Sequence, residues 1–108
     1  MTMNEYQDLA QRTANTKDAA HKIQNGILGL CGETGECADI LKKHMFQGHE
    51  FDVEKMREEV GDVLWYVAEL ALGLGMTLEE VAKRNIEKLK KRYPQGFEAE
   101  RSVNRQGE

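Results

Sequence analysis

Apolar residues recur at intervals of three and four along most of the chain, and strict apolar–polar alternation never lasts beyond a few residues. The first spacing marks one face of an α-helix, whereas alternation would indicate a half-buried β-strand. The only proline is Pro94, so no proline interrupts the periodic segments before it. The pattern predicts an all-α fold, a four-helix bundle-like single domain over residues 1–108, with its core at about 4–98 and a polar tail at 99–108.

Residues that begin or end helices divide this pattern into four elements. Gly48 interrupts it once, Asp52 then opens a new helix, and Gly73 closes that helix. Thr77 begins a capping box with the glutamate three residues later, and Pro94 ends the helix that follows. The predicted helices cover about residues 4–17, 19–45, 51–73 and 77–93.

Each predicted helix has an apolar side that we expect to be buried. These sides consist of Tyr6, Leu9 and Ala10 in the first helix, of Ile23, Ile27, Leu30, Cys37, Leu41 and Met45 in the second, of Val53, Met56, Val60, Val63, Leu64, Val67, Leu70 and Ala71 in the third, and of Leu78, Val81, Ala82, Ile86, Leu89 and Tyr93 in the fourth.

Gly26, Gly29, Gly32 and Gly35 recur every three residues inside the second predicted helix. A glycine inside a helix costs about 1 kcal/mol relative to alanine, so this repeat needs a compensating gain. One explanation is the close approach of a second backbone along the glycine ridge. The other is that the small residues leave room for a ligand beside the carboxylates between them.

Two pairs of carboxylates lie one helical turn apart, Glu33 with Glu36 and Glu59 with Asp62. Both pairs flank the apolar sides of their helices, so packing of the two helices would bring four acids together. Hard divalent cations such as Mg²⁺ prefer these oxygen ligands. The alternative is that 19 acidic residues in 108 generate such pairs on solvated faces.

The fourth predicted helix carries polar groups on its apolar side, Asn85 and Arg92, with Lys88 at the edge. Buried polar groups need partners. Amide, guanidinium and ammonium donors opposite a metal cluster suit a polyphosphate. A basic RNA-binding helix is the rival interpretation, but no aromatic residue interleaves the run before Tyr93.

The composition narrows the class of protein. The chain has 108 residues, 31% of them charged, and a net charge of −4. This acidity argues against nucleic-acid binding as the main role. No membrane-spanning run is present, and the polar start lacks the regions of a signal peptide, so we expect a cytoplasmic protein that binds no membrane. Cys31 and Cys37 are expected to be small buried thiols in a reducing compartment.

Three segments together resemble the MazG-like nucleotide pyrophosphohydrolases of the all-α NTP pyrophosphatase superfamily. GLCGETGECADILKK is similar to the family's Glu-x-x-Glu helix, REEVGDVLWY to its Glu-x-x-Asp helix, and NIEKLKKRYPQGF to its closing helix and turn. The resemblance covers nearly all of the span from Ile27 to Arg105, and the two acidic motifs are separated by the 22 residues from Cys37 to Glu58.

The resemblance implies Mg²⁺-dependent hydrolysis, with Mn²⁺ as an alternative metal, of a nucleoside triphosphate to a monophosphate and pyrophosphate in house-cleaning of the nucleotide pool. Glu36 or Glu58 would orient or deprotonate the attacking water. The implied metal ligands are Glu33, Glu36, Glu59 and Asp62, and the implied substrate-binding residues are Asn85, Lys88, Arg92, Tyr93 and Trp65. For Trp65, stacking on a base competes with a core position.

The sequence is compatible with two other functions. One is a helical interaction module with the same fold, and the other is a nucleotide sensor that binds without cutting. The four intact carboxylates argue against a degenerate copy. We also expect a homodimer or homotetramer, because so short a chain leaves apolar faces without a partner.

Overall fold

A computed structural model describes residues 1–104 and confirms the all-α prediction, since no strand occurs within them. Residues 105–108, which end the predicted tail and include the last residue of the resemblance, lie outside the described residues. Chain contacts divide the protein into one compact unit at Met1–Leu78 and another that begins at Glu79. The helices of the described residues are α1 (Met3–Gln11), α2 (Ala19–Phe46), α3 (Val53–Gly73), α4 (Leu78–Arg92) and α5 (Ala99–Val103).

The predicted ends of α2 and α3 are confirmed to within two residues. Both helices begin directly after an aspartate that caps them. The Asp18 side chain accepts a hydrogen bond from the His21 amide at 2.9 Å. The Asp52 side chain accepts one from the Lys55 amide at 3.0 Å. Each cap satisfies a backbone donor that has no partner within its own helix.

The predicted first helix is too long, because α1 ends at Gln11 and not near residue 17. The Ala10 carbonyl, which a continuing helix would use four residues later, accepts instead from the Thr13 hydroxyl at 2.7 Å and from the Trp65 indole at 3.1 Å. The Ala14 amide donates a hydrogen bond to the Gln11 carbonyl instead, at 3.0 Å. The Thr13 amide also donates to the Ala10 carbonyl, at 3.1 Å, so local turn bonds and the tertiary contact with Trp65 together replace the helical bond here.

The predicted fourth helix is confirmed, with α4 ending at Arg92 just before Tyr93. Gly96 then adopts a φ of +92°, a conformation that favours glycine. The expected polar tail contains one short helix, α5, which the periodicity did not indicate.

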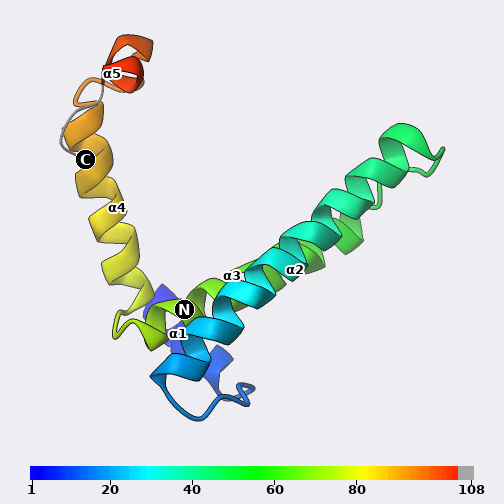
Figure 1. Cartoon of the computed structure of the whole chain (residues 1–108), viewed down its shortest axis with the longest axis horizontal. Helices are drawn as coiled ribbons and strands as arrows, with labels where there is room; N and C mark the ends of the chain where they lie inside the picture. The colour runs from blue at the N-terminus through cyan, green and yellow to red at the C-terminus, as the bar shows by residue number, and fades with distance from the viewer. Residues whose placement is uncertain (105–108) are drawn as a thin grey trace. The chain divides into compact units, whose positions relative to one another are not determined.

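The unit Met1–Leu78 is built on the pairing of α2 with α3, which run side by side (Figure 1). A Cβ at Gly26 would lie 3.0 Å from the Leu70 Cα, and one at Gly29 would lie 2.1 Å from the Tyr66 ring. Close approach therefore explains these two glycines of the repeat. It does not explain Gly32 and Gly35, where an added Cβ would meet nothing within 4 Å.

Several residues predicted to be buried are exposed in the single chain. Val60 of α3 is 59% exposed and Met45 of α2 is 60% exposed. The reason is that α2 and α3 cover only one side of each other, and α1 covers only part of α3. The other large predicted core residues that are at least 40% exposed are Leu9, Ile27, Leu41, Val53, Ile86 and Leu89, and Ala82 is exposed as well.

The cysteine prediction is half wrong, because Cys31 is exposed while Cys37 is partly buried. Among the described residues, no single helix is long and apolar enough to cross a membrane.

A buried glutamine joins α1 to the end of α3. Gln7 is only 3% exposed. Its Nε2 donates to the carbonyls of Ala68 and Met76, each at 3.1 Å, and its Oε1 accepts from the Leu78 amide at 3.0 Å. Because these partners are buried or part-buried backbone groups, the bonds hold α1 firmly on this unit.

Candidate metal centre

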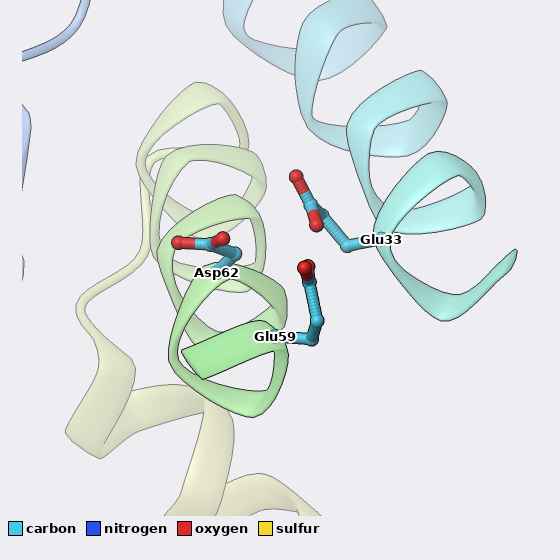
Figure 2. A group of neighbouring side chains, drawn as sticks. All are labelled: Glu33, Glu59 and Asp62. Atoms are coloured by element: carbon cyan, nitrogen blue, oxygen red, sulfur yellow. The ribbon is translucent and has the colours of Figure 1, made fainter. Parts of the chain in front are cut away.

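Three carboxylates from two helices converge between α2 and α3. Glu33 projects from α2 toward Glu59 and Asp62 on α3 (Figure 2). One ligand atom of each lies within 4.8 Å of the ligand atoms of the other two. The packing of the two helices thus brings together three of the four predicted metal ligands, which we call the acidic trio.

The acidic trio contains carboxylate oxygens that the described chain does not satisfy. Glu59 is only 7% exposed. Its Oε2 and the Oε2 of Glu33 are buried, and neither has a hydrogen-bond partner among residues 1–104. Unpartnered buried oxygens on adjacent acids are unfavourable unless a cation or a proton compensates them.

The protonation of Glu59 reflects this crowding. The adjacent Glu33 carboxylate raises the pKa of Glu59 above its ordinary value, because the two groups can share a hydrogen bond only while one of them carries a proton, and two ionised carboxylates cannot. Hydrogen bonding with Glu36 opposes the shift, while burial and the charges of Glu33 and Asp62 add to it. The site therefore favours a positive ligand, and its hard oxygen donors fit Mg²⁺ or Mn²⁺.

Three glycines that are sequence neighbours of the predicted metal ligands face open space. An added Cβ would meet nothing within 4 Å at Gly32 or Gly35 of α2, or at Gly61 of α3. Each of these glycines directly precedes an acid, namely Glu33, Glu36 or Asp62. The second explanation of the glycine repeat, room for a ligand, is compatible with this half of it.

Glu36 lies outside the acidic trio but remains coupled to it through Glu59. It lines a polar hollow of about 360 Å³ together with Asp39, Lys43 and Lys55. In that hollow the Lys43 ammonium lies 2.9 Å from the Asp39 carboxylate and holds the pKa of Asp39 below its usual value. Glu58, the other predicted catalytic acid, is exposed on α3.

A second hollow, of about 390 Å³, adjoins the acidic trio. Thr13, Glu33, Asp62, Trp65 and Tyr66 line it, so it shares two carboxylates with the trio. The Trp65 and Tyr66 rings meet edge to face, with centroids 5.0 Å apart. We call it the aromatic hollow.

Trp65 is partly buried, and its indole N–H is already bonded within the chain. The Nε1 atom donates to Thr13 Oγ1 at 2.9 Å and to the Ala10 carbonyl at 3.1 Å. Both interpretations of Trp65 therefore hold in part, since its edge is anchored while its side chain lines the aromatic hollow.

The end of α1 is the part of this site that the sequence did not indicate. Thr13 is separated from Trp65 by 52 residues, and no motif connects the two. Tyr6 of α1 also lies near the acidic trio. Burial raises the pKa of Tyr6, and the negative charge of Asp62 raises it further.

The residues predicted to bind phosphates lie on α4 or directly after it, in the unit that begins at Glu79. Within that unit Asn85 and Lys88 are exposed, whereas Arg92 and Tyr93 are partly buried. The Tyr93 ring lies 5.3 Å from the Phe97 ring. Their roles stay predictions.

Comparison with known proteins supports the resemblance. Residues 21–97 match the family model of the MazG nucleotide pyrophosphohydrolase domain. Gene 37 protein of Mycobacterium phage L5 is 36% identical over 83 residues, which cover 73% of this chain and 73% of that protein. No solved structure matches the chain. The segment matched by the family includes the acidic trio and α4 but not α1.

Proposed function

Because this chain belongs to the MazG nucleotide pyrophosphohydrolase family, we propose that it hydrolyses a nucleoside triphosphate to the monophosphate and pyrophosphate in the presence of Mg²⁺. The observation that carries this proposal is the acidic trio, whose buried oxygens on Glu33 and Glu59 have no partner among residues 1–104. Carboxylates in this state are suited to hold the cation that a polyphosphate substrate requires.

In this proposal Glu33, Glu36, Glu59 and Asp62 hold the metal. When bound, the metal neutralises phosphate charge and favours ionisation of a water molecule. The water oxygen forms a bond to the α-phosphorus, the bond from that phosphorus to the bridging oxygen breaks, and pyrophosphate leaves. A carboxylate accepts the proton that the water loses.

Glu36 is the better candidate for that carboxylate than Glu58. Glu36 is coupled to Glu59 and lines a hollow next to the acidic trio. Glu36 and Glu58 are both exposed, so the interaction with Glu59 is what distinguishes Glu36. A general base must lie within hydrogen-bond reach of the water that it activates.

Residues of α4 and its end would bind the phosphates. The Asn85 amide, the Lys88 ammonium and the Arg92 guanidinium supply donors for phosphate oxygens, and Tyr93 supplies a hydroxyl group. Trp65 would contribute to the nucleoside end of the site. The role that we propose for this hydrolysis is house-cleaning of the nucleotide pool.

The test is incubation of the purified protein with each canonical ribo- and deoxyribonucleoside triphosphate and Mg²⁺, with separate assays for pyrophosphate and for orthophosphate. We expect pyrophosphate and the monophosphate in equal amounts. Orthophosphate with the diphosphate would contradict cleavage at the α-phosphorus. Nucleotide binding without any product would favour the sensor, and absence of binding would favour the interaction module.

Glu59→Gln is the variant for this test, and Glu54→Gln is its matched control. Glu54 lies on the same helix, but it is exposed and pairs with Arg57. We expect Glu59→Gln to lose turnover and Glu54→Gln to keep it. Equal activity in the two variants would contradict a role for the acidic trio.

A further inference from the structure

Residues ahead of the family-matched segment help to build the aromatic hollow. The family model begins at residue 21, whereas α1 ends at Gln11 and Thr13 follows shortly after it. Even so, Thr13 lines the hollow together with Glu33 and Asp62 of the acidic trio. One wall of the candidate substrate site therefore comes from a part of this chain that the family model does not cover.

Thr13 and Ala10 immobilise the Trp65 indole. The indole has a single N–H donor, and it is shared between Thr13 Oγ1 at 2.9 Å and the Ala10 carbonyl at 3.1 Å. The Thr13 hydroxyl itself donates to the same Ala10 carbonyl at 2.7 Å. Rotation of the ring would break both indole contacts, so these groups fix its orientation.

The second aromatic wall is fixed from the other side. The Tyr66 ring lies directly over Gly29 of α2, where a Cβ would come within 2.1 Å of it. The Trp65 and Tyr66 ring planes are 80° apart. The two rings are thus held by different parts of the chain, and the hollow is formed before any ligand binds.

The size and the lining residues of the aromatic hollow favour binding of the nucleoside part of a nucleotide. A volume of about 390 Å³ is within the usual range for small-molecule sites. Aromatic rings provide stacking surfaces for nucleobases. Glu33 and Asp62 would repel a free phosphate there, but they would lie next to the phosphate of a nucleotide held by a cation at the acidic trio.

We propose that Thr13 is a positioning residue for nucleoside recognition, which fixes the Trp65 indole as a wall of the aromatic hollow. This proposal rests on the proposed function, because it assigns the nucleoside of the same substrate to that hollow. Thr13 acts through Trp65 on substrate affinity and not on the chemical step.

The experiment replaces Thr13 by valine, which keeps the shape but removes the hydroxyl. For the nucleotide that is hydrolysed fastest, we expect KM to rise about fivefold to tenfold in Thr13→Val, the effect of one lost hydrogen bond. We expect kcat to change less than about twofold, because the acidic trio is untouched. Thr13→Ser, which keeps the hydroxyl, should restore KM.

Trp65 is the only tryptophan in the chain, so its fluorescence reports directly on the hollow. We expect Thr13→Val to shift the emission maximum in the absence of nucleotide and Mg²⁺. Titration with the Mg²⁺ complex of a non-hydrolysable α,β-methylene triphosphate should change this emission, with a weaker apparent affinity in Thr13→Val than in the unaltered protein.

Thr16→Val is the matched control. Thr16 also uses its hydroxyl as an acceptor, from the Lys22 ammonium at 3.0 Å, but it is not part of the aromatic hollow. We expect Thr16→Val to keep the KM and the emission maximum of the unaltered protein. An equal rise in KM in both variants would overturn the proposal, as would a Thr13→Val protein that melts at a lower temperature with unchanged KM.

The outcomes separate this proposal from the proposed function. If the unaltered protein binds the α,β-methylene analogue but releases no pyrophosphate, the proposed hydrolysis is wrong, and the affinities of Thr13→Val and Thr13→Ser still decide the role of Thr13. If the unaltered protein binds no canonical analogue, both proposals are overturned.

Discussion

At the scale of single residues, Glu59 is the member of the acidic trio whose ionised form is disfavoured in the folded, metal-free protein. The raised pKa of Glu59 means that the folded, metal-free protein binds its proton more tightly than the unfolded chain does. The free energy of unfolding should therefore fall as the pH rises through this pKa. Urea denaturation in EDTA, from about pH 4 to about pH 7, should show this loss in the unaltered protein and not in Glu59→Gln. The same pH dependence in both proteins would contradict the assignment.

Magnesium should reverse that penalty. A cation that binds only the folded state stabilises it by mass action, and Glu33 and Glu59 offer unpartnered oxygens to it. We expect millimolar Mg²⁺ with nucleotide to raise the melting temperature of the unaltered protein, measured by calorimetry, but not that of Glu59→Gln. The helical circular dichroism of the two should be the same. An unchanged melting temperature in the unaltered protein would exclude the metal site.

Substitution of Lys88 on α4 distinguishes a role in substrate binding from a role in stability. Its side chain is exposed, so Lys88→Ala should change the free energy of unfolding by less than about 0.5 kcal/mol. If the ammonium binds a phosphate in the transition state, kcat/KM should fall about 100-fold. Lys83→Ala, at another exposed lysine of α4, should keep kcat/KM. A similar loss in both variants would indicate only a general effect of charge.

At the scale of elements, the glycine repeat of α2 contains closely packed and open positions, and one pair of variants can separate them. An alanine at Gly29 would collide with the Tyr66 ring, whereas one at Gly32 would meet nothing within 4 Å. We expect Gly29→Ala to destabilise the protein and Gly32→Ala to stabilise it by up to about 1 kcal/mol, the helix-propensity difference. Chemical denaturation measures both, and equal effects would contradict the packing of α2 on α3.

The helices themselves were largely predictable, because local residues determine where most of them begin and end. Asp18 and Asp52 cap α2 and α3 through their own side chains, and Gly73 is the last residue of α3. The end of α1 was not predictable in this way. It depends in part on the Trp65 indole, which takes part in the bonding of the Ala10 carbonyl from 55 residues away.

The same distinction applies to the candidate site. The i, i+3 spacing within α2 and α3, together with the family resemblance, singled out Glu33, Glu59 and Asp62, which the structure brings together. Glu36 shares that spacing but lines the neighbouring polar hollow. Thr13 carries no spacing signal at all, because only tertiary packing places it beside Trp65.

At the scale of the whole molecule, apolar surface is left without a partner in one copy of the chain. Leu28 and Phe46 of α2 are 72% and 77% exposed, and Val60 of α3 is 59% exposed. The buried apolar residues among those described are few, namely Ile40, Ala68, Ala71 and Leu78. A chain of this size with so small a core gains stability by covering such surfaces.

We therefore expect the protein to form a homodimer or homotetramer, since identical apolar faces related by a two-fold axis can cover each other. Light scattering at micromolar concentration should give a multiple of the 12.3 kDa chain mass. Leu28→Glu should weaken the assembly, because it places a charge on an exposed apolar position without disturbing the contacts within the chain. Lys42→Glu, at an exposed polar position of the same helix, should leave the mass unchanged. A particle of 12.3 kDa from the unaltered protein would contradict self-association.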